Sequence, residues 1–77
     1  MSNTSQISKT KITVFINEEP FLCLSDTSLA SLLNYLDFDF RQILIEYNHE
    51  IIPKELFHNI KLKHRDLVEV VTIVGGG

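Results

Sequence analysis

Cysteine is nearly absent from this chain of 77 residues, and its scarcity limits both covalent and metal chemistry. Because Cys23 is the only one, neither an internal disulfide nor a metal site built from several thiolates of one chain can form. We therefore expect a reducing compartment, which is the cytoplasm or, if the chain is organelle-encoded, the plastid stroma.

Long apolar runs and excess positive charge are missing as well. The polar start MSNTSQISKTK lacks the apolar segment of a secretory signal, and no apolar run approaches the roughly 18 residues that span a bilayer. Seven basic and ten acidic side chains give a net charge of −3, the wrong sign for a protein that neutralises phosphates. Neither a membrane nor a nucleic acid is an expected partner.

Few residues suggest catalysis or metal binding. A nucleophilic Cys23 would need His49, His58 or His64 as its base, but a cysteine in an apolar strand is usually a small buried hydrophobe, and we interpret it so. The three histidines do not have the short spacing that places two metal ligands on one helix face, so no metal site is expected. We predict no catalytic residue and no bound cofactor.

Two aspartates and three glycines are the remaining candidates for chemistry. Asp37 and Asp39 flank Phe38 in a helix-to-strand connection, and because no basic or metal-binding context is expected there, we interpret them as solvated loop residues. All three glycines stand at the end of the chain, so no glycine-rich loop is available to cradle a phosphate.

Hydrophobic periodicity predicts one small domain at residues 11–74, between a flexible extension at 1–10 and a flexible glycine tail at 75–77. Residues 11–17 alternate as a half-buried strand, and after the turn NEEP residues 21–24 complete a hairpin. Ser28 is the expected N-cap of a helix whose leucines recur at Leu29, Leu32, Leu33 and Leu36. Residues 43–48 and 50–52 form further strands, and Pro53 ends the second of them.

The final strand, residues 66–74, is apolar on both faces. The order of elements predicts an α+β fold of the β-grasp (ubiquitin-like) type, in which one main helix packs on one face of a mixed sheet of four to five strands. The other face would then carry an apolar patch of Phe15, Leu44, Val71 and Ile73. We interpret this patch as a partner-binding surface, although the N-terminal extension could instead cover it.

The terminal carboxylate of Gly77 poses a chemical problem, because an ionised carboxylate is a poor electrophile unless it is activated. ATP activates such a group by forming an acyl-adenylate. Gly75, Gly76 and Gly77 have no side chains, so they would form an arm thin enough to thread into the active site of a partner.

The chain resembles the ThiS family of sulfur carriers in thiamine thiazole synthesis, from about Lys11 to Gly77. The resemblance rests on the helix motif TSLASLL, the segments EYNHEIIPKE and RDLVEVV, and the ending VGGG. It implies that an E1-like activating enzyme adenylates Gly77 with ATP and Mg²⁺. A cysteine persulfide donor would then convert Gly77 to a thiocarboxylate, and thiazole synthase would accept the sulfur. The chain would be a carrier and not an enzyme.

Two positions differ from the family pattern, which commonly has glycine where this chain has His49 and Arg65. If the backbone has positive φ at these positions, each non-glycine residue lowers the stability of the fold by about 1 kcal/mol. Alternative functions remain open: the small subunit of molybdopterin synthase, which uses the same thiocarboxylate, a ubiquitin-like modifier of lysines, or an interaction module with inert glycines.

Overall fold

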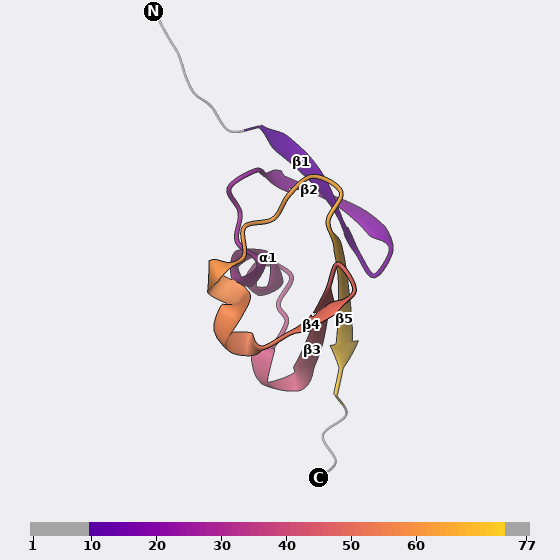
Figure 1. Ribbon diagram of the computed structural model, residues 1–77, viewed down its shortest axis with the longest axis vertical. Helices are drawn as coiled ribbons and strands as arrows, with labels where there is room; N and C mark the ends of the chain where they lie inside the picture. The colour runs from indigo at the N-terminus through magenta and orange to yellow at the C-terminus, as the bar shows by residue number, and fades with distance from the viewer. Residues whose placement is uncertain (1–9, 74–77) are drawn as a thin grey trace, which may run out of the picture.

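Alternating apolar residues build a five-stranded sheet in the computed structural model, which describes residues 10–73. The strand order is β2-β1-β5-β3-β4 (Figure 1). The strands are β1 (Lys11–Ile16), β2 (Glu19–Leu24), β3 (Ile43–Tyr47), β4 (Glu50–Ile52) and β5 (Leu67–Thr72). Only β1 and β5 pair in parallel, so the sheet is mixed, and the predicted β-grasp architecture is confirmed.

The predicted helix is α1 (Leu29–Tyr35), and both of its ends are fixed by local hydrogen bonds. The Ser28 hydroxyl oxygen accepts the backbone N–H of Ser31 at 3.0 Å, which makes Ser28 the N-cap, as predicted. At the other end, the N–H groups of Asp37 and Phe38 return to the carbonyls of Asn34 and Leu33, each at 3.0 Å. This pair of bonds is a Schellman motif with Asp37 in its left-handed position, at φ 65°.

The core lies between α1 and one face of the sheet. It contains alternate residues of β1, β3 and β5, the inner face of α1, and side chains from the segment that precedes β5. Its buried apolar members are Ile12, Val14, Ile16, Leu29, Ala30, Leu32, Leu33, Ile43, Ile45, Phe57, Leu62, Val68 and Val70. The 3-10 helix η3 (Lys54–Asn59) contributes Phe57 and packs beside α1, while the second 3-10 helix, η2 (Phe40–Gln42), leads into β3.

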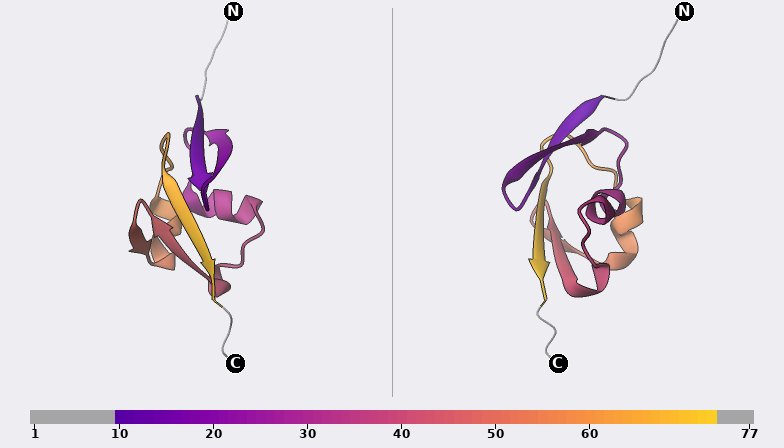
Figure 2. Two further views of the ribbon diagram at one scale, coloured as in Figure 1. Left: turned by 90° about the vertical axis from the view of Figure 1, so that its right-hand side faces the viewer. Right: turned by 180° about the vertical axis from the view of Figure 1, so that it is seen from behind.

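All helical segments lie on the same side of the sheet. Seen from the other side, β5 and β1 stand in front with α1 behind them (Figure 2, left). Within residues 10–73, no segment covers this second face.

Some element boundaries differ from the sequence prediction. Strand β2 begins at Glu19 and not at Phe21, because the β1–β2 turn needs only Asn17 and Glu18, both at positive φ. Thr10, expected in the flexible extension, accepts a hydrogen bond from the N–H of Ser25 at 2.8 Å. Strand β5 ends at Thr72, and the predicted members of the extension and tail at 1–9 and 74–77 lie outside the described residues.

Asp39 is solvent-exposed, as predicted, but the expectation that it has no basic neighbour was wrong. Its carboxylate caps η2 by accepting the N–H of Arg41 at 2.9 Å, and it forms a two-pronged ion pair with the guanidinium of the same residue. These interactions lower the pKa of Asp39 to about 2. The pair is solvent-exposed and organises the entry into β3 locally.

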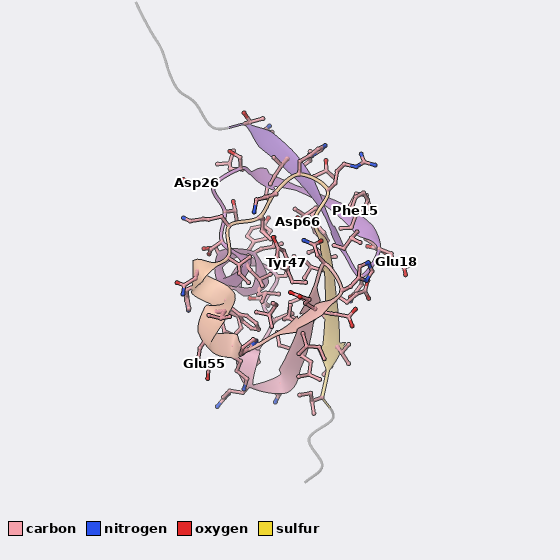
Figure 3. The ribbon with its side chains drawn as sticks, viewed as in Figure 1. Phe15, Glu18, Asp26, Tyr47, Glu55 and Asp66 are labelled. Carbon is pink, nitrogen blue, oxygen red and sulfur yellow. The ribbon has the colours of Figure 1, made fainter. Side chains whose placement is uncertain are left out.

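Asp66 joins several elements just before β5 and is the buried charged residue of the described chain. Its carboxylate accepts hydrogen bonds from the Tyr47 hydroxyl at 2.5 Å, the Lys63 N–H at 2.7 Å and the Asn48 side-chain amide at 3.2 Å. Its carbonyl accepts the N–H of Phe15 at 2.9 Å. Asp66 therefore ties β1 and β3 to the start of β5, and Figure 3 shows Tyr47 directed toward it.

The two hairpin turns and the residue before Asp66 have left-handed backbone. His49 and Arg65, which replace the glycines of the family pattern, have φ of 73° and 74°. Asn48 precedes His49 with φ of 48°, so both central residues of the β3–β4 turn are left-handed, as in a type I′ turn. The glycine-type conformation is thus kept at both positions without glycine.

Tyr47→Phe should lower the free energy of unfolding by about 1.5–3 kcal/mol, because the buried Asp66 carboxylate loses a donor. Burial, the hydrogen bond to Asp66 and its charge raise the pKa of Tyr47 from 10.0 to about 12. The folded state therefore holds the phenolic proton more tightly, and this stabilisation is complete below pH 10 and lost as the pH rises through about 12. Urea unfolding between pH 7 and 12 should show the wild type and variant converging above pH 10. The exposed Tyr35→Phe is the control, and a constant difference at all pH values would contradict this assignment.

His49→Gly should relieve left-handed strain, whereas His58→Gly, within η3, relieves none. Both substitutions change the entropy of the unfolded chain equally, so this contribution cancels in the comparison, although His58→Gly also removes the ring contact with Phe40. We expect His49→Gly to be more stable than His58→Gly by about 1–2 kcal/mol in chemical denaturation. Equal stabilities would mean that the turn does not strain His49.

Candidate functional site

The helix-free face of the sheet contains all four residues of the predicted patch. Leu44 on β3 and Val71 on β5 are directly opposite each other and are 46% and 54% exposed. Ile73, just beyond β5, is 42% exposed, and its N–H donates to the Gln42 carbonyl at 2.7 Å. Phe15 on β1 is half-buried, and Figure 3 shows it at the edge of the molecule beside Glu18. Whether a partner binds these side chains stays a prediction.

The same face carries further apolar residues that the sequence analysis left out of the patch. Leu67 pairs with Phe15, and Leu22 and Leu24 pair with the outward residues Thr13 and Lys11. Ile51 on β4 pairs with Glu46 of β3. We call the whole surface the open face: Lys11, Thr13, Phe15, Pro20, Leu22, Leu24, Leu44, Glu46, Ile51, Leu67, Glu69, Val71 and Ile73. Alternation within each strand indicated the outward positions, but only the register shows which of them are neighbours.

Two acidic residues interrupt the apolar surface near its centre. Glu46 of β3 and Glu69 of β5 are opposite each other and half-buried. With Phe15, Glu18, His49 and Leu67 they line a pocket of about 160 Å³. A second hollow, of about 170 Å³, lies between Leu44, Ile51 and Val71 on the other side of the two glutamates. The open face is therefore apolar with an acidic centre.

The lower part of this face leads to the end of the chain. Leu44, Val71 and Ile73 lie where β5 ends, and only Val74 separates Ile73 from the three glycines. Gly75, Gly76 and Gly77 lie outside the described residues, so their predicted threading and modification remain predictions. A molecule that contacts these side chains would be within a few residues of the terminal carboxylate.

The structure offers little support for chemistry elsewhere in residues 10–73. Burial raises the pKa of the Cys23 thiol against a smaller opposing effect of a hydrogen bond with Thr27, which disfavours the nucleophilic thiolate. The histidines belong to separate segments: His64 accepts the N–H of Thr13 through Nδ1 at 3.1 Å, and the ring of His58 lies 6.3 Å from that of Phe40.

The described residues contain neither a metal-binding cluster nor a membrane-spanning helix. No group of three or more histidine, cysteine, aspartate or glutamate side chains in residues 10–73 is arranged to hold a metal ion. The longest helix in that range, α1, has seven residues, and none is long and apolar enough to cross a membrane.

Comparison with known proteins connects this fold with a family. The ThiS family model matches residues 9–77. The protein ycf40 of Porphyra purpurea is 50% identical over 66 residues, which are 86% of this chain and 93% of that protein. The sulfur carrier protein ThiS of Bacillus subtilis is 38% identical over 50 residues, covering 65% of this chain and 76% of that protein.

A longer relative and a solved structure give two further matches. A thiazole synthase of Paramagnetospirillum magneticum is 32% identical over 62 residues, which are 80% of this chain but only 19% of that protein. The crystal structure of the thiamine biosynthesis protein ThiS from Geobacter metallireducens superposes with a TM-score of 0.74 at 25% identity, over 86% of this chain and 100% of that one. By its sequence over nearly the whole length, and by its β-grasp fold, the chain belongs to the ThiS family.

Proposed function

We propose that this protein is the sulfur carrier for the thiazole ring of thiamine, with the sulfur held as a thiocarboxylate on Gly77. The supporting observation is that a member of the ThiS family presents an open apolar face whose last strand leads into three C-terminal glycines. As a member of the ThiS family, the protein would be a carrier and co-substrate of other enzymes.

The proposed chemistry begins with activation of the Gly77 carboxylate. One carboxylate oxygen attacks the α-phosphorus of ATP, which an E1-like enzyme binds with Mg²⁺, and pyrophosphate leaves. The resulting acyl-adenylate has AMP as its leaving group. Its carbonyl carbon therefore reacts with nucleophiles that do not react with the free carboxylate.

Sulfur transfer follows on a persulfide donor of the cysteine desulfurase type. The terminal persulfide sulfur attacks the carbonyl carbon, AMP leaves, and an acyl disulfide links carrier and donor. A thiol then attacks the donor sulfur, forms a disulfide with it, and releases the thiocarboxylate, so the thiol supplies the two electrons that the step requires.

Thiazole synthase is the proposed acceptor of this sulfur. A segment similar to this chain makes up 19% of a protein named thiazole synthase, and joining the two in one polypeptide favours a shared reaction. The open face would hold the carrier against each partner while the glycines reach the active site, and its apolar area would offset the entropy lost in ordering the glycine arm.

Incubation of the protein with ATP, Mg²⁺, the activating enzyme and a persulfide donor should raise the mass of its C-terminal peptide by about 16 Da, as sulfur replaces oxygen. Intact-mass spectrometry gives the readout. A chain lacking Gly76 and Gly77 should keep its circular dichroism and gain no mass. An unchanged mass in the full-length chain would contradict every thiocarboxylate function, and conjugates on a denaturing gel would indicate a modifier instead.

The partner-binding patch is tested by two leucines of similar exposure on different sides of the molecule. Leu44 lies on the open face at 46% exposed, and Leu56 lies on η3 at 43% exposed. Leu44→Ser should raise the KM of the activating enzyme for the carrier by about tenfold, because an apolar interface contact is lost. Leu56→Ser should leave the KM unchanged. Equal effects of the two substitutions would exclude the open face as the binding surface.

A further inference from the structure

Glu46 and Glu69 form a like-charge pair at the centre of the open face. They are directly opposite across the antiparallel β3–β5 ladder, between the inward-facing pairs Ile45–Val70 and Tyr47–Val68. Residues opposite each other in such a ladder have Cβ atoms about 4.5–5.5 Å apart, and like charges there are destabilising. The isolated domain therefore has a repulsion in its sheet that neutral side chains would avoid.

No cation within residues 10–73 compensates this pair. The ion pair found there joins Arg41 to Asp39 in the segment that leads into β3, and neither Glu46 nor Glu69 takes part in it. Glu18 adds a third carboxylate to the lining of the same pocket. His49 also lines it but forms no ion pair with any of these carboxylates.

Apolar side chains flank the two glutamates on both sides. Phe15 and Leu67 lie on one side, and Leu44 and Val71 lie on the other. Any surface that covers these apolar residues also removes the carboxylates between them from water. Burial of unpaired carboxylates is strongly unfavourable, so a partner that uses this face must bring a positive charge to its centre.

We propose that the adenylating enzyme docks on the open face with an arginine whose guanidinium bridges Glu46 and Glu69. The proposal rests on the sulfur-carrier function above. Arginine fits better than lysine, because its planar fork of donors reaches two carboxylates at once and its weaker hydration suits a buried interface. The ring of Phe15, in the wall of the same pocket, offers a face on which the guanidinium can stack.

The test uses substitutions with opposite expected effects on stability and on binding. Glu46→Gln and Glu69→Gln each remove the repulsion, so the melting temperature of the free protein should rise by about 1–5 °C. Each should also raise the KM for the carrier in ATP-dependent pyrophosphate release by about tenfold with kcat unchanged, because the arginine loses a charged partner. The KM of the wild type should rise more steeply with added salt than the KM of a double variant that carries both Glu46→Gln and Glu69→Gln.

Glu55→Gln on η3 makes the same change in net charge on the helical side of the molecule, where Figure 3 shows Glu55. It should leave the KM unchanged, which separates a local contact from long-range attraction. A KM within twofold of wild type in both face variants would overturn the proposal. So would a fall in melting temperature that accompanies the rise in KM, since the glutamates would then be structural.

The same kinetic measurements distinguish failure of the arginine contact from failure of the sulfur-carrier function on which it rests. A wild-type chain that the adenylating enzyme does not activate at any concentration overturns both. Normal activation of the wild type with unchanged KM in the variants overturns the arginine contact alone.

Discussion

Within residues 10–73, one seven-residue helix and two 3-10 helices cover one face of a five-stranded sheet and leave its other face open, and the rest of the structure depends on this one-sided cover. The covered face supplies the core, where Val14, Ile45 and Val68 are fully buried. The open face keeps apolar residues of the same strands in contact with solvent. Because β5 lies at the centre of the sheet and also leads into the glycines, the surface available for binding and the carboxylate available for reaction belong to one continuous segment.

The fold and the four patch residues were predictable because they depend on local patterns. Alternation in each strand, the leucine spacing of α1 and the Ser28 cap are all properties of neighbouring residues, and so is the outward position of Leu44 or Val71. The opposition of Glu46 and Glu69 was not predictable, because it depends on the register of β3 and β5, which are not consecutive in the sequence. The hydrogen bond of Tyr47 was not predictable either, because nothing near this residue in the sequence identifies Asp66 as its acceptor.

Several residues of the described chain lower the stability of the fold. His49 and Arg65 hold left-handed backbone without glycine, and the Glu46–Glu69 pair places repulsion in the sheet. The hydrogen bonds of Asp66 have the opposite effect, because they join β1, β3 and β5 at the end of the sheet that is far from Ile73. His49 and Arg65 lie at this same end, next to Asn48 and Asp66, so the Asp66 hydrogen bonds hold the segments that carry the left-handed backbone.

The central claim is that the open face binds the enzyme that acts on Gly77. Methyl NMR of the labelled protein, titrated with the adenylating enzyme and ATP, tests it most directly. The account predicts that the methyl signals of Leu44, Val71 and Ile73 shift or broaden on binding, while those of Leu56 on the helical side do not. Perturbation confined to the helical side, or activation of Gly77 with the open-face methyl signals unchanged, would contradict it.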